Sequence, residues 1–537
     1  MMVDAKKGSA AVDAALRQQV REGFELLRQG RLEDARELAD RLVASHGGDA
    51  EVLFFASEVW LAADDAKSAL GFIAAAVAAA PDQLALHLKK AGNLIMLRRR
   101  TDARQAAAVA EALFGNDGKA LWDIGKVYRG CGDTVDAHRL FQKALAVMGP
   151  NPGLLLDLAA TQFYVGDIAG AESSIEMVFT HGPGFGHALY LRSILRRQTE
   201  THNHVADLEA RLKAGFPNAA GQAACQFALA KELEDLGQAD RSFSVLSGAA
   251  SLKRQTLTHN AAAERAAIEA VGAAYSSAVM QADVPGHDEV GAIFIVGMPR
   301  TGTTLLERML GSHSAVKSAG ELLDFGQALA IATRKCQDAN PDLSAVEASL
   351  LIDFAALGRD YMASARQAAA GSRVFIDKMP ANFIYCGLIR KALPKARIIH
   401  LVRDPMDSCY AVYKTLFNQA YYFSYDFDEL AAYYTTYHQL MRHWHEVMPG
   451  AILDVRYEDL VTDTEGQARR ILDWCGLDWQ AKVTSPSENQ APTTTASAAQ
   501  VREPIYTSSV QKWRNHEAGL APLRARLAAA GIVDAQE

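Results

Sequence analysis

The sequence has few cysteines, no excess of basic residues and no long apolar run. Its six cysteines are scattered and form no Cys-x-x-Cys pair, which argues against a zinc site and against a disulfide framework. The formal net charge of -8 gives no indication of nucleic-acid binding. Residues 1–20 lack the apolar core of a signal peptide, and no apolar run is long enough to span a bilayer. These absences predict a cytoplasmic protein with reduced thiols, no membrane span and no nucleic-acid partner.

The bulk composition is that of an ordinary globular protein. Of its 537 residues, 49% are hydrophobic and 22% are charged, which excludes a largely disordered chain. A chain of this length is expected to contain more than one domain. The patterns along the sequence indicate two domains of different class.

An alanine recurs at intervals of 34 residues in the first third of the chain, at Ala35, Ala69, Ala103, Ala137 and Ala171. This is the period of tetratricopeptide repeats, in which pairs of helices stack into a solenoid and a small residue lets the two helices approach closely. Residues 121–150 form the clearest unit. The resemblance predicts an all-α array over residues 1–280 and a linker over 281–291. Such arrays offer a concave surface, so the array either binds a protein partner or only stabilises the second domain.

The stretch AIFIVGMPRTGTTLLERML, residues 292–310, organises the second domain, which we place at 292–537. An apolar, β-branched run predicts a buried strand, and a helical pattern follows a loop that contains two glycines. A strand, a glycine-bearing loop and a helix N-terminus form a phosphate-binding site. Gly297 and Gly302 have P-loop spacing, but Thr303 stands where a nucleoside triphosphatase has its lysine. The positive charge comes from Arg300 instead.

Three later segments place polar residues directly after predicted strands. Glu321 follows a short strand and is either a general base or a glutamate favoured by a helix dipole. Lys378 ends the strand at 373–380, where parallel sheets bind ligands. Arg403 follows the buried strand 398–402 and suits an anion better than a metal, with Ser408 at the start of the next helix. We further predict a strand at 452–455, helices at 344–370 and 382–393, and a long loop at 493–515 that closes over an anion.

In this order, GMPRTGTT, Glu321, DKMP, VRDP, RYEDL and IYTSSVQKW resemble the sulfotransferase family over residues 293–513. The chain looks like bacterial sulfotransferases fused to tetratricopeptide repeats, and its catalytic part is similar to protein-tyrosine sulfotransferases. The implied fold is an α-helical solenoid followed by a P-loop-type α/β domain with a parallel central sheet. The implied donor is 3′-phosphoadenylyl sulfate (PAPS), and no metal is expected.

The resemblance also implies roles for individual residues. The donor's 5′-phosphosulfate would be held by Arg300, Thr301, Gly302, Thr303 and Thr304. Arg403 would bind the 3′-phosphate, and the residues of the late loop that would cover the nucleotide are Tyr506, Ser508, Ser509 and Lys512. Glu321 would be the catalytic base, with Lys378 and Arg300 stabilising the charge on the transferred group.

One position departs from the family pattern. The family usually has a serine eight positions after the arginine that binds the 3′-phosphate, and Ala411 stands there in this sequence. Either Ser408 substitutes for it or the 3′-phosphate is bound more weakly. Two other classes stay open, a degenerate P-loop kinase or nucleoside triphosphatase and a catalytically inactive repeat scaffold. The acceptor hydroxyl stays open as well, and could belong to a peptide tyrosine, a sugar or another small molecule.

Overall fold

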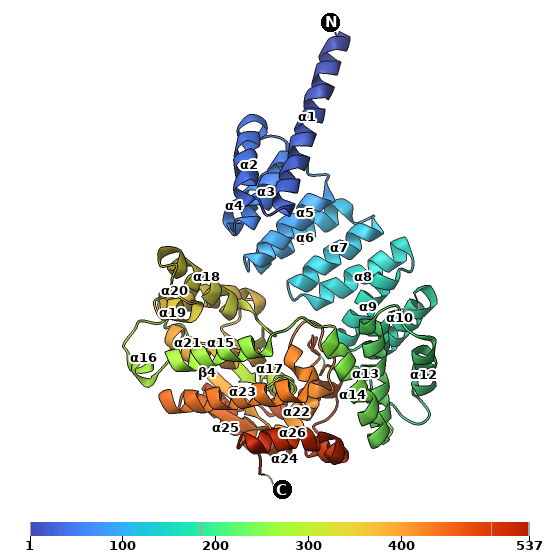
Figure 1. Ribbon diagram of the computed structural model, residues 1–537, viewed down its shortest axis with the longest axis vertical. Coiled ribbons are helices and arrows are strands. Elements are labelled where there is room, and N and C mark those ends of the chain that lie inside the picture. Colours follow the sequence, from blue (N-terminus) through green and yellow to red (C-terminus); the bar gives the residue numbers. More distant parts are fainter. Residues whose placement is uncertain (1, 183–184, 496, 535–537) are drawn as a thin grey trace. The chain divides into compact units, whose positions relative to one another are not determined.

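The computed structural model describes residues 2–182, 185–495 and 497–534 of the chain. Its contacts divide the chain into two compact units, Met1–Gly149 and Pro150–Glu537, and each is described by itself (Figure 1). In the part of the chain that the structure describes, no helix is long and apolar enough to cross a membrane.

The first unit is built of helical hairpins. Its helices are α1 (Met2–Arg28), α2 (Leu32–His46), α3 (Ala50–Ala62), α4 (Ala66–Ala79), α5 (Leu84–Met96), α6 (Arg100–Phe114), α7 (Gly118–Gly130) and α8 (Thr134–Met148). Ala35, Ala69, Ala103 and Ala137 lie in the second helix of successive hairpins, and each is fully buried. The spacing in the sequence therefore marks the close contacts between helices, as predicted.

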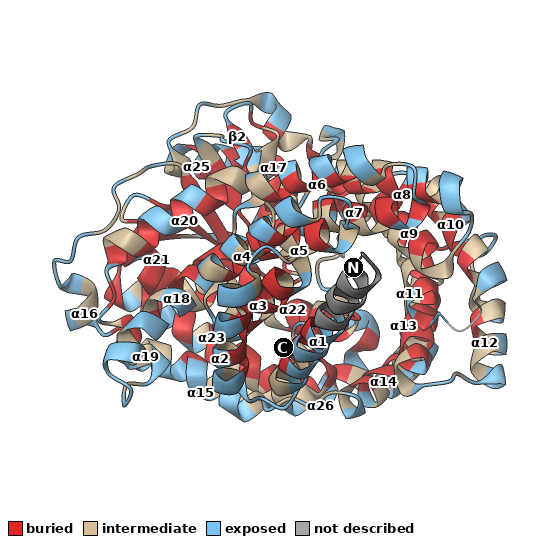
Figure 2. Cartoon of the chain, turned by 90° about the horizontal axis from the view of Figure 1, so that it is seen from above, coloured by how far each residue is buried: buried red, intermediate tan, exposed pale blue. Residues whose placement is uncertain are grey.

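The second unit begins with further helices of the same kind. These are α9 (Pro152–Val165), α10 (Ile168–His181), α11 (Gly186–Ile194), α12 (Val205–Ala214), α13 (Ala219–Asp235), α14 (Ala239–Gln255), α15 (Ala261–Ala274) and α16 (Ser277–Gln281). Ala171 of α10 is again fully buried, and buried residues run along α11 and α13 (Figure 2). The predicted helical region is confirmed. The predicted domain division at 280 stays a prediction, because the compact units divide at 149 instead.

A five-stranded parallel sheet forms the centre of the second unit. Its strands are β1 (Ala292–Gly297), β2 (Val316–Ser318), β3 (Val374–Asp377), β4 (Arg397–Val402) and β5 (Ile452–Arg456). They are ordered β2-β3-β1-β4-β5, and every neighbouring pair is parallel. The carboxyl ends of all five strands therefore meet along one edge of the sheet, which is where such folds bind ligands.

Helices cover both faces of this sheet. On one face Phe294 and Phe375 pack in a cluster with Tyr361 and Trp444, and on the other Ile295 packs with residues of α17 and α25. The helical segments of this region are α17 (Thr303–Gly311), α18 (Asp324–Ala339), α19 (Ala345–Ser349), α20 (Phe354–Ala368), η1 (Pro380–Tyr385), α21 (Cys386–Ala392), α22 (Pro405–Tyr413), η2 (Tyr422–Tyr425), α23 (Phe427–Val447), α24 (Tyr457–Thr462), α25 (Thr464–Cys475), η3 (Ala481–Thr484), η4 (Pro486–Glu488), η5 (Gln500–Arg502), η6 (Lys512–His516) and α26 (Glu517–Ala529). The predicted α/β class with a parallel sheet is confirmed.

The helix predicted at 344–370 is two helices, α19 and α20. A capping box starts α19 at Ser344, and the Asp353 side chain caps the N-terminus of α20 by accepting from the Ala356 N–H. Each cap satisfies backbone donors that a continuous helix would have used internally, so the chain breaks between the two. The helix predicted at 382–393 likewise begins as the 3₁₀ turn η1 and becomes α-helical only at Cys386.

Candidate active site

The loop between β1 and α17 needs glycine at two positions. Gly297 has a φ of 148°, and a Cβ atom there would lie 2.7 Å from the carbonyl oxygen of Leu401. Gly302 has a φ of 105°, and a Cβ atom there would lie 2.5 Å from the ring of Tyr457. Residues with a side chain rarely adopt such backbone conformations, so the tight loop depends on both glycines. Arg300, which lies between the two glycines, also has a positive φ of 65°, a conformation that is uncommon for residues other than glycine.

The late segment, residues 493–495 and 497–512, folds over this loop. The Arg300 guanidinium donates to the Ser497 hydroxyl and, at 3.0 Å, to Oε1 of Gln500. The Thr304 hydroxyl lies 3.4 Å from that of Thr495. Thr301 instead donates to the carbonyl oxygen of Met298 at 2.8 Å, which braces the loop from inside. Thr303 is buried at the start of α17. The late loop predicted to close over an anion therefore covers the loop between β1 and α17.

Arg403 lies beside Arg300, directly after β4. It is 9% exposed and donates to the carbonyl oxygens of Arg300 at 3.2 Å and Ser509 at 2.6 Å. Its guanidinium lies 4.8 Å from the ring centre of Tyr457, which follows β5. Among the residues that the structure describes, the Nε atoms of Arg300 and Arg403 are both buried without a hydrogen-bond partner. Unused donors on two neighbouring cations, one buried and one half-buried, favour an anionic ligand.

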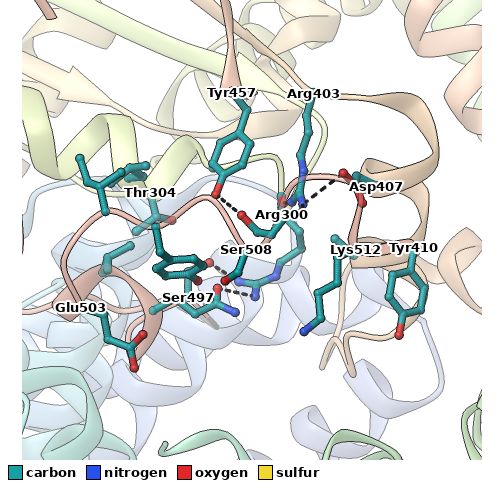
Figure 3. A pocket seen from close by; sticks show the side chains of 18 of the residues that line it. Arg300, Thr304, Arg403, Asp407, Tyr410, Tyr457, Ser497, Glu503, Ser508 and Lys512 are labelled. Atoms are coloured by element: carbon teal, nitrogen blue, oxygen red, sulfur yellow. Dashed lines mark hydrogen bonds and ion pairs between the residues drawn. The ribbon is translucent and has the colours of Figure 1, made fainter. Parts of the chain in front are cut away.

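These residues surround a cavity of about 140 Å³ (Figure 3). Its lining includes Arg300, Gly302 and Thr304 of the loop, Arg403 and Ala411 after β4, and Tyr506, Ser508, Ser509 and Lys512 of the late segment. A second cavity of about 780 Å³ shares Arg300, Tyr506 and Lys512 with the first and is lined on its other side by helices α11, α13 and α14 of the array. The two cavities therefore share a cationic part of their lining.

Glu321 and Lys378 form an ion pair near the other end of the sheet edge. Lys378 is 1% exposed, and its ammonium contacts the half-exposed Glu321 carboxylate and, at 3.7 Å, that of Glu307 on α17. Burial alone would lower the pKa of Lys378, but the two carboxylates outweigh it and raise the pKa. Lys378 is therefore a permanent cation held between two acids, and one of these acids faces solvent.

A buried carboxyl group supports this pair from below. Asp377 is fully buried at the end of β3 and accepts from the Tyr361 hydroxyl at 2.9 Å, from Asn382 at 3.3 Å and from the Leu322 backbone N–H at 3.4 Å. Burial raises the pKa of Asp377 to about 8, against the effect of these hydrogen bonds. Because Leu322 is the neighbour of Glu321, Asp377 fixes the backbone on both sides of the ion pair.

The structure brings most of the predicted site residues to one edge of the sheet. Following the strand order, this edge carries Glu321, Lys378, Arg300 and Arg403. Ser408 lies apart from the cavities described above: it is 1% exposed and donates to the carbonyl oxygen of Arg403 at 3.3 Å. The Ser509 hydroxyl pairs with that of Tyr457 at 2.6 Å. Burial, the largest of several influences, raises the pKa of Tyr506 to about 12. The roles predicted for these residues stay predictions.

Sequence reasoning missed four residues that contact these groups. Glu307 follows Thr303 by one helical turn, and the helical period could have placed it on the same side as the loop. Tyr457 stands in the RYEDL segment, directly after a predicted strand, which is the same signal that marked Arg403. Lys414 and Glu234 carry no local signal, because their relation depends on how an array helix packs against α22.

A group of histidine and aspartate side chains lies elsewhere on the sheet. His400 of β4 and His445 of α23 contact the same carboxylate oxygen of Asp454, at 2.8 and 3.1 Å. The other ring nitrogen of His400 lies 2.5 Å from the hydroxyl of Tyr437. Hydrogen bonds to the two histidines, against the effect of burial, hold the pKa of Asp454 below its ordinary value. We interpret the group as a hydrogen-bonded network that joins β4, β5 and α23.

The structure is that of an α/β protein with a parallel sheet. A glycine-bearing loop and two arginines lie at the carboxyl edge of this sheet, where such folds bind ligands. Residues 292–481 match the family model described as the sulfotransferase family. This match confirms the predicted resemblance for this segment, which contains the loop, Glu321, Lys378 and Arg403.

The shares of the chain that relatives match range from 20% to 72%. An uncharacterized protein of Aquifex aeolicus is 28% identical over 397 residues, which are 72% of this chain and 52% of that protein, so this chain spans about half the relative's length. Protein-tyrosine sulfotransferase 2 of Gallus gallus is 23% identical over 44% of this chain and 69% of its own. Omega-hydroxy-beta-dihydromenaquinone-9 sulfotransferase of Mycobacterium bovis is 30% identical over 20% of this chain and 29% of its own.

Solved structures similar to parts of the chain are of two kinds. A sulfotransferase domain from the curacin biosynthetic pathway is 17% identical, with a TM-score of 0.31, and the match covers 44% of this chain and 98% of that domain. A tetratricopeptide-repeat protein of Parabacteroides merdae is 14% identical, with a TM-score of 0.32, and the match covers 44% of this chain and 93% of that protein.

Proposed function

We propose that this protein is a sulfotransferase that moves a sulfuryl group from PAPS to an acceptor hydroxyl. One observation carries the proposal: four neighbouring strands are followed by Glu321, Lys378, Arg300 and Arg403, in this order along the sheet. The candidate base, a buried cation and two candidate anion-binding arginines therefore lie along one edge of the sheet. The match of residues 292–481 to the sulfotransferase family supports the same reaction.

The residues at the cavity fit the proposed donor. Arg300 and the loop threonines would hold the 5′-phosphosulfate, since helix N-termini and backbone N–H groups bind such anions. Arg403 and Lys512 would hold the 3′-phosphate at the other side of the cavity. The unused Nε donors of both arginines and the space kept open by Gly302 are features of a site built for an anion. The donor would supply the activated sulfuryl group.

The transfer is proposed to run in line between two oxygens. Glu321 removes the proton from the acceptor hydroxyl, and the resulting oxygen attacks the sulfur atom while the bond from sulfur to the bridging phosphate oxygen breaks. Lys378 and Arg300 stabilise the negative charge that gathers on the sulfuryl oxygens and on the leaving phosphate. Sulfuryl transfer of this kind needs positioning and fixed positive charge.

The acceptor is an open part of the proposal. The names of the relatives include one sulfotransferase of protein tyrosine and one of a dihydromenaquinone, so related chains are named for different hydroxyl groups. A tyrosine in a peptide is our first candidate. The larger cavity, about 780 Å³ and lined by array helices, offers room for an acceptor side chain next to Arg300.

Thermal unfolding in the presence of nucleotides tests the donor class first. A ligand that binds only the folded state raises the melting temperature. We expect a rise with adenosine 3′,5′-bisphosphate, and a rise with ATP and Mg²⁺ alone would favour a kinase. Incubation with radiolabelled PAPS and a panel of tyrosine peptides, phenols, sugars and lipid alcohols then identifies the acceptor. No melting shift with either nucleotide would contradict the proposal and favour an inactive scaffold.

A further inference from the structure

The helical array contributes a carboxylate to the wall of the larger cavity. Glu234 lies near the end of α13, and its side chain is only 10% exposed. It accepts a hydrogen bond from the Tyr410 hydroxyl at 2.7 Å and lies 2.9 Å from the ammonium of Lys414 and 3.3 Å from that of Lys512. One acid of the array therefore holds two cations of the sulfotransferase-like part.

Lys414 stands close to the position where the family pattern lacks its hydroxyl. Ala411 on α22 and Lys414 directly after it are three residues apart, and both line the cavity that contains Arg403. Residues at this spacing lie on the same side of a helix. Lys512 lines the same cavity from the late segment. Three cations from three segments thus converge where Ala411 leaves no polar group, while Ser408 is turned toward the carbonyl oxygen of Arg403.

We propose that Lys414 binds the second phosphate of the donor nucleotide in place of the missing serine, and that Glu234 of the array positions Lys414 for this role. The inference rests on the proposed function, because it assigns a residue to that same site. It also gives the array a definite part in catalysis: without α13, the phosphate subsite lacks the acid that holds its lysines.

The chemistry of the ammonium group permits both contacts at once. Lysine has three donors, so Lys414 can bind Glu234 and a phosphate oxygen together. Burial, aided by neighbouring cations, lowers the pKa of Lys414 to about 8, while Glu234 acts in the opposite direction. The charged or titratable groups that face Lys414 or its partner acid are Glu234 on α13, Tyr410 on α22, Arg403 after β4, and Lys512 and His516 of η6. Without Glu234, two cations would face a half-buried lysine with no acid to balance them, and its pKa would fall further.

The test compares adenosine 3′,5′-bisphosphate with adenosine 5′-monophosphate on the full chain. Calorimetric dissociation constants for both ligands are measured from pH 7 to pH 9.5. The ratio of the monophosphate constant to the bisphosphate constant isolates the contribution of the second phosphate. The variants are Lys414→Met, Lys414→Arg and Glu234→Gln, with the exposed Glu465→Gln as a matched control. Melting temperatures without ligand show that each variant folds.

In the unaltered protein the ratio should favour the bisphosphate and fall as the pH rises through about 8, where Lys414 loses its proton. Lys414→Met should lower the ratio at neutral pH about tenfold, since a charged hydrogen bond is lost. Lys414→Arg should keep it across the range, because arginine does not titrate there. Glu234→Gln should shift the fall to lower pH.

An unchanged ratio in Lys414→Met would overturn the inference while leaving the proposed function standing. A pH profile in Glu234→Gln identical to that of the unaltered protein would overturn the role of the array acid. If Lys414→Met does not fold, the flat profile expected of Lys414→Arg decides the question. If the unaltered protein binds neither nucleotide, the proposed function itself fails, and that result is distinct from a loss confined to the variants.

Discussion

Lys378 and Glu321 lie 57 positions apart in the chain and form an ion pair at the carboxyl edge of the sheet. The pair exists because β2 and β3 are parallel neighbours, so the residues that follow them emerge side by side. Lys378 is buried and Glu321 is half exposed, so the acid is the partner that an acceptor can reach. The lysine therefore holds the candidate base in place.

Removing either member of this pair should abolish chemistry without abolishing nucleotide binding. We expect Glu321→Gln and Lys378→Ala each to lower turnover by roughly 10²–10⁴-fold, the range typical of lost general-base or charge-stabilising groups. The dissociation constant of adenosine 3′,5′-bisphosphate should stay within a few-fold, because this ligand carries no sulfuryl group to contact the pair. Steady-state rates with PAPS and calorimetric binding measure the two effects.

The exposed Glu465→Gln, whose partner is Arg469 on the same helix, is the matched control and should leave both quantities unchanged. Near-normal turnover in Glu321→Gln would remove Glu321 from the role of base. A parallel loss of nucleotide binding would instead indicate that the pair shapes the pocket.

Asp377 should make the folded protein less stable as the pH rises. Its pKa is about 8 in the folded state and about 4 when unfolded, so between these values the folded state binds one more proton. The contribution of this group is therefore fully present below pH 4 and is lost as the pH rises through 8, by at most about 1.4 kcal/mol per pH unit. Asp377→Asn keeps a carbonyl acceptor for Tyr361 and removes the titration.

Urea unfolding of both proteins at pH 5.5 and pH 8.5 checks this. From pH 5.5 to pH 8.5, the free energy of unfolding should fall less in Asp377→Asn than in the unaltered protein. A difference that stays constant would show that Asp377 is ionised in the folded protein at both.

The sequence predicted the elements of the site better than their partners. Apolar runs such as residues 293–296 predict strands, and polar residues that follow them belong to the ligand-binding edge if the sheet is parallel. Arg300, Lys378 and Arg403 could therefore be predicted from the sequence. The strand order that sets Glu321 beside Lys378 has no sequence signal of its own. Glu234 could not be predicted from the sequence. The regular spacing of the repeats ends before α13, and only tertiary packing brings the Glu234 carboxylate to Lys414.

Gly302→Ala should weaken ligand binding at the loop between β1 and α17 more than it destabilises the fold. The residue would keep a φ of 105°, which costs about 1 kcal/mol or more for a residue with a side chain, and its Cβ atom would meet the Tyr457 ring at 2.5 Å. Relief requires the loop or Tyr457 to move, and Tyr457 lies over Arg403 and bonds Ser509. We expect the bisphosphate to bind at least tenfold more weakly, measured by calorimetry. Gly311→Ala, where only one atom lies near the added Cβ at 3.8 Å, is the control and should bind normally.

Arg502 connects the late segment to the array. Its loss should make the late segment, which covers the loop between β1 and α17, more mobile. Its guanidinium donates to the carbonyl oxygens of Phe163 at 3.1 Å and Tyr164 at 2.6 Å, which lie in the last turn of α9. The Thr493 backbone N–H also donates to Tyr164 at 3.0 Å, so two anchors hold the segment.

Arg502→Ala removes the stronger anchor, and hydrogen exchange of backbone amides in residues 497–512 should accelerate about tenfold or more, while exchange in the strands stays unchanged. Arg514→Ala is the matched control, since this exposed arginine of the same region lies over Trp513. Adding adenosine 3′,5′-bisphosphate should slow the exchange again in Arg502→Ala, because the ligand would bind Arg300 beneath the segment and Ser508 within it. If exchange in this segment were equal in the variant and the unaltered protein, the array would not hold the late segment, and the cover would depend on its other contacts, such as those with Arg300, Arg403 and Tyr457.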